Sequence, residues 1–415
     1  MNTGQVAAAA SAASDKKKGG FLGSLLMWII VAILLGSALS LVLPDWLARV
    51  FVTFNGLFGN FLGFFIPILI FALITPAIAG IGRGAGKWLL VTTGIAYAST
   101  ALSGFAAYGL SRALYPALLS SQGLGDAVDI DAGALSPYFE VEMPPLMNIM
   151  TALLLAFIFG IGMTVVKADT AYGLAKEVEE IVQLTISKFV IPLLPIFIFG
   201  MFLSMGKNGN MRETMTMFAV VLILAIVATL VLLLVQFLIA GAIAGRNPLK
   251  AWKTMLPAYF TALGTSSSAA TIPVTYSCAQ KNGVSANVAG FVVPLCATIH
   301  LSGSMMKISL FAFAIMFMAG TPVSPALAFG FVLMLGITMI AAPGVPGGAI
   351  MAASTLLSSM LGFTDDQVAL MIAAYIAIDS FGTACNVTGD GAIAMIVNKL
   401  SGGRGAGENT EHKVA

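Results

Sequence analysis

Charged residues are scarce in this sequence. Asp, Glu, Lys and Arg make up 9% of its 415 residues, whereas soluble domains carry roughly 25%. Hydrophobic residues make up 59%, so the composition indicates a chain that lies in a lipid bilayer. With a formal net charge of +2 and no stripe of basic residues, the sequence gives no sign of nucleic-acid binding.

Histidine and cysteine are rare as well. The two histidines are His412, in a polar C-terminal stretch, and His300, in an apolar segment. The cysteines have no CxxC spacing, which argues against a disulfide framework or a metal centre: Cys278, Cys296 and Cys385. Residues 266–268, His300 and Asp379 are of types found in hydrolases, but neither a Gly-x-Ser-x-Gly elbow nor a His-Glu-x-x-His motif occurs. The sequence therefore predicts neither an enzyme nor an organic cofactor.

Six apolar runs of membrane-spanning length occupy the first part of the chain. They fall at 21–43, 50–80, 88–118, 144–166, 180–205 and 214–245, and each exceeds or approaches the ~20 residues that a spanning helix needs. We interpret the first as a retained span, because it is longer than a signal-peptide core and no small-residue cleavage signature precedes Pro44. Residues 1–20 and 401–415 are predicted to be disordered tails.

Basic residues between the runs predict the orientation in the membrane. They gather at 16–18, 83–87, 167–176 and 246–253, whereas 119–143 holds five acidic residues and no Lys or Arg. The positive-inside rule then predicts that both termini lie on the cytoplasmic side of a cell (inner) membrane. Lys207 and Arg212 are exceptions, because they fall on the predicted outer side.

After Pro248, polar and helix-breaking residues interrupt the apolar segments. Residues 252–282 contain a serine-rich tip, Ser266, Ser267 and Ser268, and residues 323–361 contain a glycine-proline tip at 342–348. Irregular backbone at membrane depth must be buried in protein or line a cavity, so both segments are predicted to be re-entrant hairpins. We expect the hydroxyls and amides of the serine tip to hold a substrate carboxylate, because helix N-termini favour anions.

Each predicted hairpin is followed by one long span, 286–318 and 366–399. The two spans share a short echo, residues 300–304 and 386–390, as an inverted-repeat transporter would. We expect Gly303 and Gly389 to let these helices unwind and free carbonyls for a cation. The predicted fold is therefore an all-α polytopic membrane protein with eight transmembrane helices and two re-entrant hairpins.

The last span carries a polar stripe. Steps of four, seven and eleven residues from Asp379 bring Thr383, Asn386 and Asp390 to nearly one helical face. A charge at the bilayer centre costs roughly 2.5–3.5 kcal/mol or more, so such residues usually face a cavity or a partner. The stripe therefore predicts a transport site. A channel pore is an alternative, but paired Asp residues between two gates favour alternating access.

A second polar face is predicted on 286–318. His300, Ser304 and Lys307 are spaced by four and seven residues. Lys307 either snorkels to the interface or is a fixed positive charge paired with a carboxylate, in the place of a bound cation. His300 is either a core histidine or a proton-coupling residue.

Three motifs together resemble the dicarboxylate/amino acid:cation symporters, the glutamate transporter family. They are Ser266-Ser267-Ser268 with Pro273-Val274-Thr275, Gly344-Val345-Pro346-Gly347, and Asn386-Val387-Thr388-Gly389-Asp390. The resemblance covers 248–400 by motif and the first half by layout. It implies a homotrimer that imports an amino acid or dicarboxylate with Na+ and/or H+. The half at 21–245 would contain a static scaffold, and 246–400 would be a transport core that moves as an elevator.

The resemblance also implies roles for single residues. Asp379 would hold the substrate amino group, Thr383 and Asn386 its carboxylate or amine, and the serine tip its carboxylate. Asp390, with Asn386, would ligate Na+. The extracellular gate would be formed by Gly344, Val345, Pro346 and Gly347.

Two departures from the family pattern change the expected chemistry. Members that carry acidic substrates place an arginine at the position of Gly382 or of Thr265, and neither is basic here, so a neutral amino acid is favoured. The family's Asn-Met-Asp-Gly-Thr reads as residues 300–304 here, with Ser302 in the place of the aspartate. His300, Ser302 and Lys307 are therefore candidates for altered cation coupling with fewer sodium ions. A C4-dicarboxylate symporter that uses Lys307 as anion partner is the main alternative, followed by an anion channel.

Overall fold

A computed structural model of the chain describes residues 25–83, 87–119, 135–147, 149–207, 211–340, 342 and 347–403. Every regular element in these ranges is a helix, which confirms the predicted all-α class. The predicted tails at 1–20 and 404–415 lie outside the described residues, as do Gly344, Val345 and Pro346 of the second tip.

The helices of the first half follow the predicted apolar runs. They are α2 (Leu25–Leu39), α3 (Asp45–Arg83), α4 (Lys87–Leu118), α5 (Ile149–Val165), α6 (Asp169–Thr185), α7 (Ile191–Lys207) and α8 (Met211–Ala244). A short π-helical segment, η3 (Ile186–Val190), joins α6 to α7.

The second half consists of shorter helices. They are α9 (Pro248–Thr265), α10 (Ser268–Lys281), α11 (Ala286–Ile299), α12 (Ser302–Met318), α13 (Pro325–Ile340), α14 (Gly348–Leu361), α15 (Asp365–Ala377) and α16 (Asp379–Ser401). Local signals set several of their starts. Asn247 caps α9, whose first residue is Pro248, and Thr364 forms a capping box with Gln367 at the start of α15.

Within the described residues, five helices are long and apolar enough to cross a bilayer, and α15 and α16 together give a sixth. The sequence predicted eight spans. The other two, 21–43 and 144–166, correspond to α2 and α5, which are described over 15 and 17 residues. The described parts of these helices are shorter than the ~20 residues of a typical spanning helix.

Both long spans of the second half are broken, but not at the glycines where unwinding was predicted. One breaks at His300 and Leu301, between α11 and α12, and the other at Ile378, where α15 and α16 meet at 61°. Gly303 lies in the first turn of α12 and Gly389 lies inside α16, so the predicted unwinding at these glycines is wrong. Their role is close packing, because a Cβ at Gly303 would lie 2.6 Å from Cys385 Cβ.

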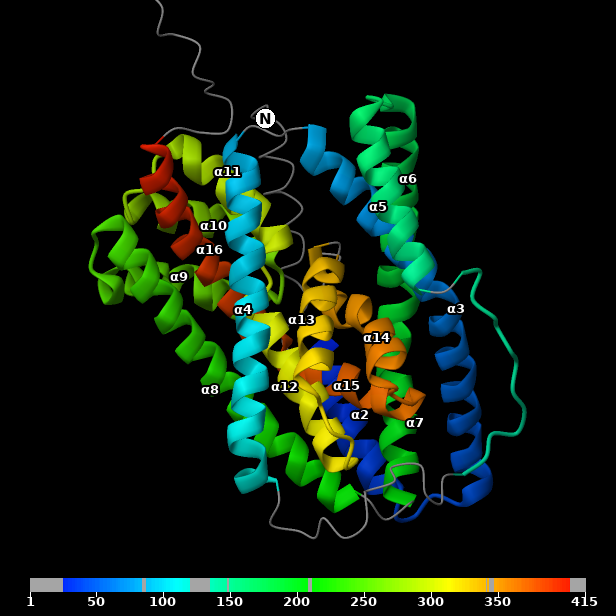
Figure 1. The fold of residues 1–415 in the computed structure, drawn as a ribbon. Coiled ribbons are helices and arrows are strands. Elements are labelled where there is room, and N and C mark those ends of the chain that lie inside the picture. The colour runs from blue at the N-terminus through cyan, green and yellow to red at the C-terminus, as the bar shows by residue number, and fades with distance from the viewer. Residues whose placement is uncertain are drawn as a thin grey trace, which may run out of the picture.

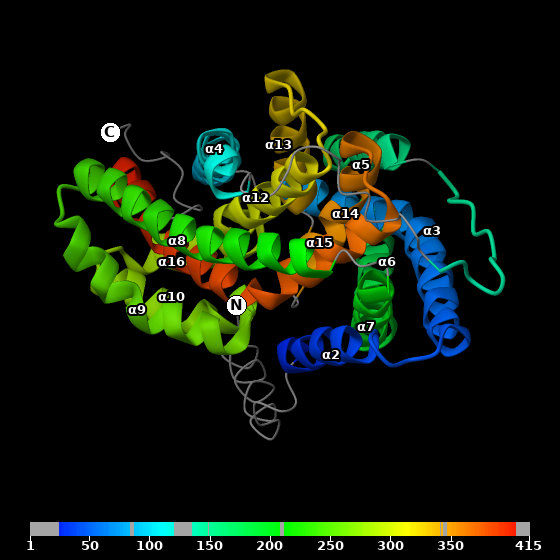
Figure 2. The ribbon, with the colours of Figure 1, turned by 90° about the horizontal axis from the view of Figure 1, so that it is seen from below.

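The helices divide into two groups (Figures 1 and 2). Helices α3, α5, α6 and α7 pack on one another, and α2 packs on α7. Helices α8, α9, α10, α11 and α16 share a second apolar core, and α12 to α15 lie between the groups. Helices α4 and α8 come from the first half of the chain but pack on α12 and α16.

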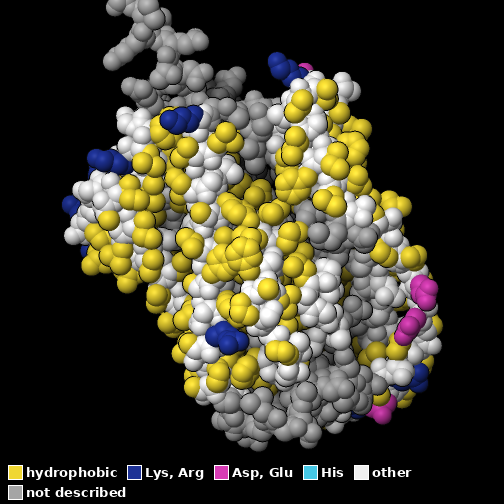
Figure 3. All heavy atoms as spheres, in the orientation of Figure 1, with side chains coloured by type: hydrophobic (Ala, Val, Ile, Leu, Met, Phe, Trp, Pro, Cys, Tyr) yellow, Lys and Arg dark blue, Asp and Glu magenta, His cyan; other side chains and the backbone are white. Residues whose placement is uncertain are grey.

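The side chains exposed on the surface that would contact lipid are largely apolar. Figure 3 shows one face covered mainly by hydrophobic side chains with few charged ones. On α8, Ile223, Val227 and Val231 are exposed large hydrophobic residues, which suits contact with acyl chains. In contrast, Lys307, Asp379 and Asp390 are buried.

Candidate functional site

The serine tip reverses the chain within two residues. Ser266 ends α9 in the left-handed conformation (φ 48°), and Ser267 is extended and caps α10 by accepting a hydrogen bond from the Ala270 N–H at 3.3 Å. A non-glycine residue rarely adopts a positive φ, and such strain concentrates at functional sites. The turn leaves the N-terminus of α10, with Ser268, facing the interior.

A small, partly open pocket lies at this tip. It is lined by hydroxyl, amide and carboxyl groups and by small apolar residues: Ser266, Ser268, Ala297, Thr298, Leu301, Ser304, Ala342, Ala349, Tyr375, Asp379, Thr383 and Asn386. The lining comes from both predicted hairpins and from both broken spans. Asp379 is its charged lining residue.

Asp379 holds two structural elements at once. Its Oδ2 accepts a hydrogen bond from the Gly347 N–H, at 2.9 Å, at the N-terminus of α14. Its Oδ1 lies 3.8 Å from Lys307 Nζ. A carboxylate at a helix N-terminus is favourable, and the lysine supplies the counter-charge that a buried carboxylate needs.

Lys307 is fully buried and is not among the residues that line the pocket. Its ammonium donates to the backbone oxygens of Ile378, at 3.0 Å, and Asp379, at 3.4 Å, beside the break between α15 and α16. It also lies 4.0 Å from the centroid of the Tyr375 ring. A Cβ at Gly382 would overlap Lys307 Cε and Nζ, so the lysine occupies the volume beside this glycine.

Asn386 ties α16 to the start of α12. Its Oδ1 accepts from the Gly303 N–H at 2.8 Å and its Nδ2 donates to Ser304 Oγ at 3.1 Å. Ser304 Oγ also lies 2.8 Å from the Tyr375 hydroxyl. The side chain of Thr383 donates to the Asp379 backbone oxygen at 3.0 Å.

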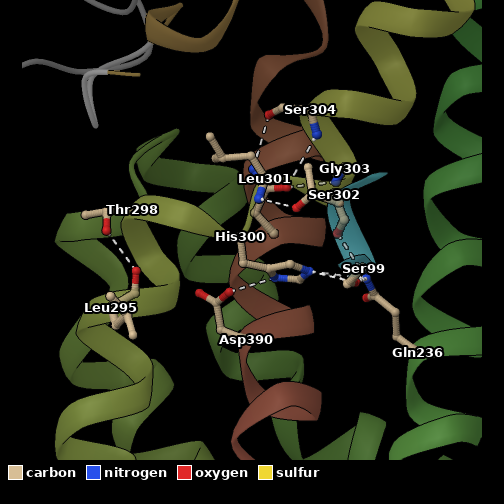
Figure 4. Close-up of polar contacts among 12 residues, drawn as sticks. Ser99, Gln236, Leu295, Thr298, His300, Leu301, Ser302, Gly303, Ser304 and Asp390 are labelled. Carbon is tan, nitrogen blue, oxygen red and sulfur yellow. Dashed lines mark hydrogen bonds and ion pairs between the residues drawn. The ribbon is translucent and has the colours of Figure 1, made fainter. Parts of the chain in front are cut away.

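Asp390 lies in a separate polar network (Figure 4). His300 Nδ1 donates to Asp390 Oδ1 at 2.9 Å, and His300 Nε2 lies 3.0 Å from Ser99 Oγ. The Gln236 amide donates to Ser99 Oγ at 3.1 Å and to Ser302 Oγ at 3.0 Å. Asp390 and His300 are 1% and 0% exposed, and neither lines the pocket.

Helix α4 satisfies the backbone of the break at His300 and Leu301. Thr100 Oγ1 accepts from the Leu301 N–H at 3.2 Å, and Ser103 Oγ donates to the Ser302 backbone oxygen at 2.8 Å. Non-helical backbone is thus tolerated here because side chains bury and pair it.

Comparison with known proteins identifies the family. The model of the sodium:dicarboxylate symporter family matches residues 25–400. The chain belongs to this family. Excitatory amino acid transporter 1 of Rattus norvegicus is 33% identical over 209 residues, which are 49% of this chain and 37% of the relative. Excitatory amino acid transporter 3 of Mus musculus is 36% identical over 183 residues, 43% of this chain and 33% of the relative.

The family and these relatives are transporters, so the prediction that the chain is not an enzyme is confirmed. With its apolar helices, this symporter family member is a multi-pass membrane protein. The alignments span about a third of the length of the curated relatives.

The pocket gathers only some of the residues predicted from the symporter motifs. Ser266, Ser268, Asp379, Thr383 and Asn386 line it, whereas Ser267 instead caps α10. The cation-coupling candidates His300, Ser302, Lys307 and Asp390 lie outside its lining.

The expected common face of His300, Ser304 and Lys307 is wrong. The break after α11 separates His300 from α12, so its side chain turns toward Asp390 while Lys307 faces Asp379. Ser99 and Gln236 were not among the residues predicted from the sequence. A lone amide such as Gln236 within an apolar run was the available signal.

Proposed function

We propose that the protein is a secondary active symporter that imports a small neutral amino acid, or a related carboxylate, together with Na+ and/or H+. The observation that carries this proposal is the pocket, which combines one carboxylate with hydroxyl groups at a helix N-terminus. A zwitterion has matching groups. Its ammonium would bind Asp379, and its carboxylate would bind Ser266, Ser268 and the first amides of α10.

The position of Lys307 supports a neutral substrate. Its ammonium is directed to Asp379 and to two backbone oxygens and does not line the pocket. Since Lys307 also fills the space beside Gly382, a side chain there has no room to clamp a second carboxylate. Thr383 and Asn386 would complete the polar lining around the substrate.

A C4-dicarboxylate substrate is the second candidate, because Lys307 brings a positive charge next to Gly382. This requires the ammonium to leave Asp379 and to turn into the pocket. The relatives' names refer to excitatory amino acids, and the alignments cover 37% and 33% of those chains.

The proposed transport cycle is an elevator movement in a homotrimer. Residues 246–400 would form the moving core, with α4 and α8 travelling with it because they pack on α12 and α16. The remaining helices of 21–245 would form the scaffold. Residues 344–347 would form the extracellular gate. Both termini would lie on the cytoplasmic side of the inner membrane.

A ligand screen by thermal shift tests the proposal, because a ligand that binds the folded state raises its apparent stability. We expect a neutral amino acid to raise the melting temperature of the wild type, and Asp379→Asn to abolish the shift. Uptake of that amino acid into proteoliposomes should saturate and require a cation gradient. A C4-dicarboxylate shift that survives Asp379→Asn supports the second candidate, and non-saturable flux contradicts symport.

A further inference from the structure

Each described carboxylate buried in the core already has a basic partner. Lys307 faces Asp379, and His300 is hydrogen-bonded to Asp390. Both partners lie on one stretch of chain, the break and the helix α12 that follows it. A buried carboxylate needs such a partner or a bound cation. The pairing at Asp390 bears directly on the coupling ion, because this family is named for sodium.

The surroundings of Asp390 do not fit a sodium ion. Hard cations bind through oxygen atoms that are free to coordinate. Here Asp390 Oδ1 accepts from the imidazole, and Ser99 Oγ and Ser302 Oγ both accept from the Gln236 amide. Each donated N–H hydrogen carries partial positive charge and occupies a lone pair of its oxygen, so the N–H groups of this network compete with a cation for these oxygens.

The side-chain amide oxygen of Asn386, which lies on the same helix as Asp390, also accepts hydrogen bonds from N–H groups. Asn386 Oδ1 accepts from the N–H groups of Gly303, at 2.8 Å, and of Ser304, at 3.4 Å. The Oε1 of Gln236 has no hydrogen-bond partner among the described residues, but a single amide oxygen does not make a coordination shell.

The packing around Gly389 shows that the chain leaves space for the imidazole of His300. A Cβ at Gly389 would lie 2.7 Å from His300 Cε1 and 2.7 Å from Gln236 Oε1. The absence of a side chain at this position lets the ring and the amide enter between α16 and α8. His300 is fully buried there and is fixed from both of its ring nitrogens.

We propose that His300 replaces a coupling cation at Asp390 and that its imidazole keeps sodium off this carboxylate. The inference rests on the proposed function, because it concerns which ion that transporter carries. Any sodium that drives uptake would bind away from Asp390. Restoring the oxygen-bearing residues of the family pattern at positions 300 and 302 should create a sodium site.

The test measures melting temperature in purified protein without substrate, while sodium chloride replaces choline chloride at constant ionic strength. We expect no Asp390-dependent sodium response in the wild type. His300→Asn, or His300→Asn combined with Ser302→Asp where the single change unfolds the protein, should gain a saturable sodium-dependent rise. Adding Asp390→Asn to either variant should remove it.

Two results would overturn the proposal. One is a saturable sodium response of the wild type that Asp390→Asn abolishes, and the other is a folded His300→Asn/Ser302→Asp variant with no sodium response. A wild-type response that Asp390→Asn leaves intact places sodium elsewhere and supports the proposal. These samples contain no substrate, so the sodium test does not depend on amino acid binding. A protein that binds no amino acid would therefore contradict the proposed function and leave this inference untouched.

Discussion

The two buried aspartates of α16 have different surroundings, although they lie on the same helix. Asp379 lines the pocket, accepts a hydrogen bond from Gly347 at the start of α14 and has its lysine 3.8 Å away. Asp390 is 1% exposed, does not line the pocket and is held at 2.9 Å by His300. The loosely paired aspartate that reaches the pocket suits a substrate that comes and goes. The tightly paired Asp390 suits a carboxylate that keeps His300 as its permanent partner.

Removing the partner of Asp379 should produce the largest loss of stability. Lys307→Met leaves a buried carboxylate unpaired, which costs about 3–5 kcal/mol. The double variant Lys307→Met/Asp379→Asn should recover most of this loss, because the unpaired charge is gone. Unfolding in SDS measures both, with Lys250→Met at an exposed site as control. A Lys307→Met protein as stable as the wild type would show that the two charges do not depend on each other.

Removing the carboxylates one at a time should separate their roles. Asp379→Asn should weaken amino acid binding by about 100-fold, roughly 3 kcal/mol, since the ammonium loses its ionised partner. Asp390→Asn should change the affinity far less, because Asp390 does not reach the pocket. Calorimetric titration of both purified variants gives the two affinities. Equal losses would contradict the comparison.

The difference between the two aspartates was only partly predictable from the sequence. The serine run located the turn between α9 and α10, because irregular backbone is conspicuous within apolar runs. The breaks at His300 and Ile378 depend on partners far along the chain. Thr100, Ser103 and Lys307 form hydrogen bonds with the backbone at or beside these breaks, and no local pattern around residues 300 or 378 specifies those contacts.

Filling the space around His300 should cost less. Gly389→Ala places a methyl group 2.7 Å from His300 Cε1 and Gln236 Oε1, and such overpacking typically costs about 1–3 kcal/mol. Gly109→Ala on α4 is the matched control, because its Cβ meets nothing within 4 Å. Thermal unfolding of the two variants should differ. A Gly389→Ala protein with unchanged stability would mean that the imidazole is not tightly seated.

The smallest effects are expected at the serine tip beside Asp379. Ser268→Ala should weaken substrate binding several-fold with little loss of stability, because Ser268 lines the pocket. Ser267→Ala should cost about 1 kcal/mol of stability through the lost cap of α10. Melting temperatures and amino acid titrations of both variants distinguish the two roles. The opposite pattern would mean that the substrate contacts Ser267 instead.

The most direct measurement is a high-resolution cryo-EM map of the protein in lipid, with sodium and with the amino acid that stabilises it most. The account predicts ligand density between Asp379 and the serine tip, and an imidazole of His300 still on Asp390. A cation coordinated by Asp390 with the ring displaced, or a ligand away from Asp379, would contradict it.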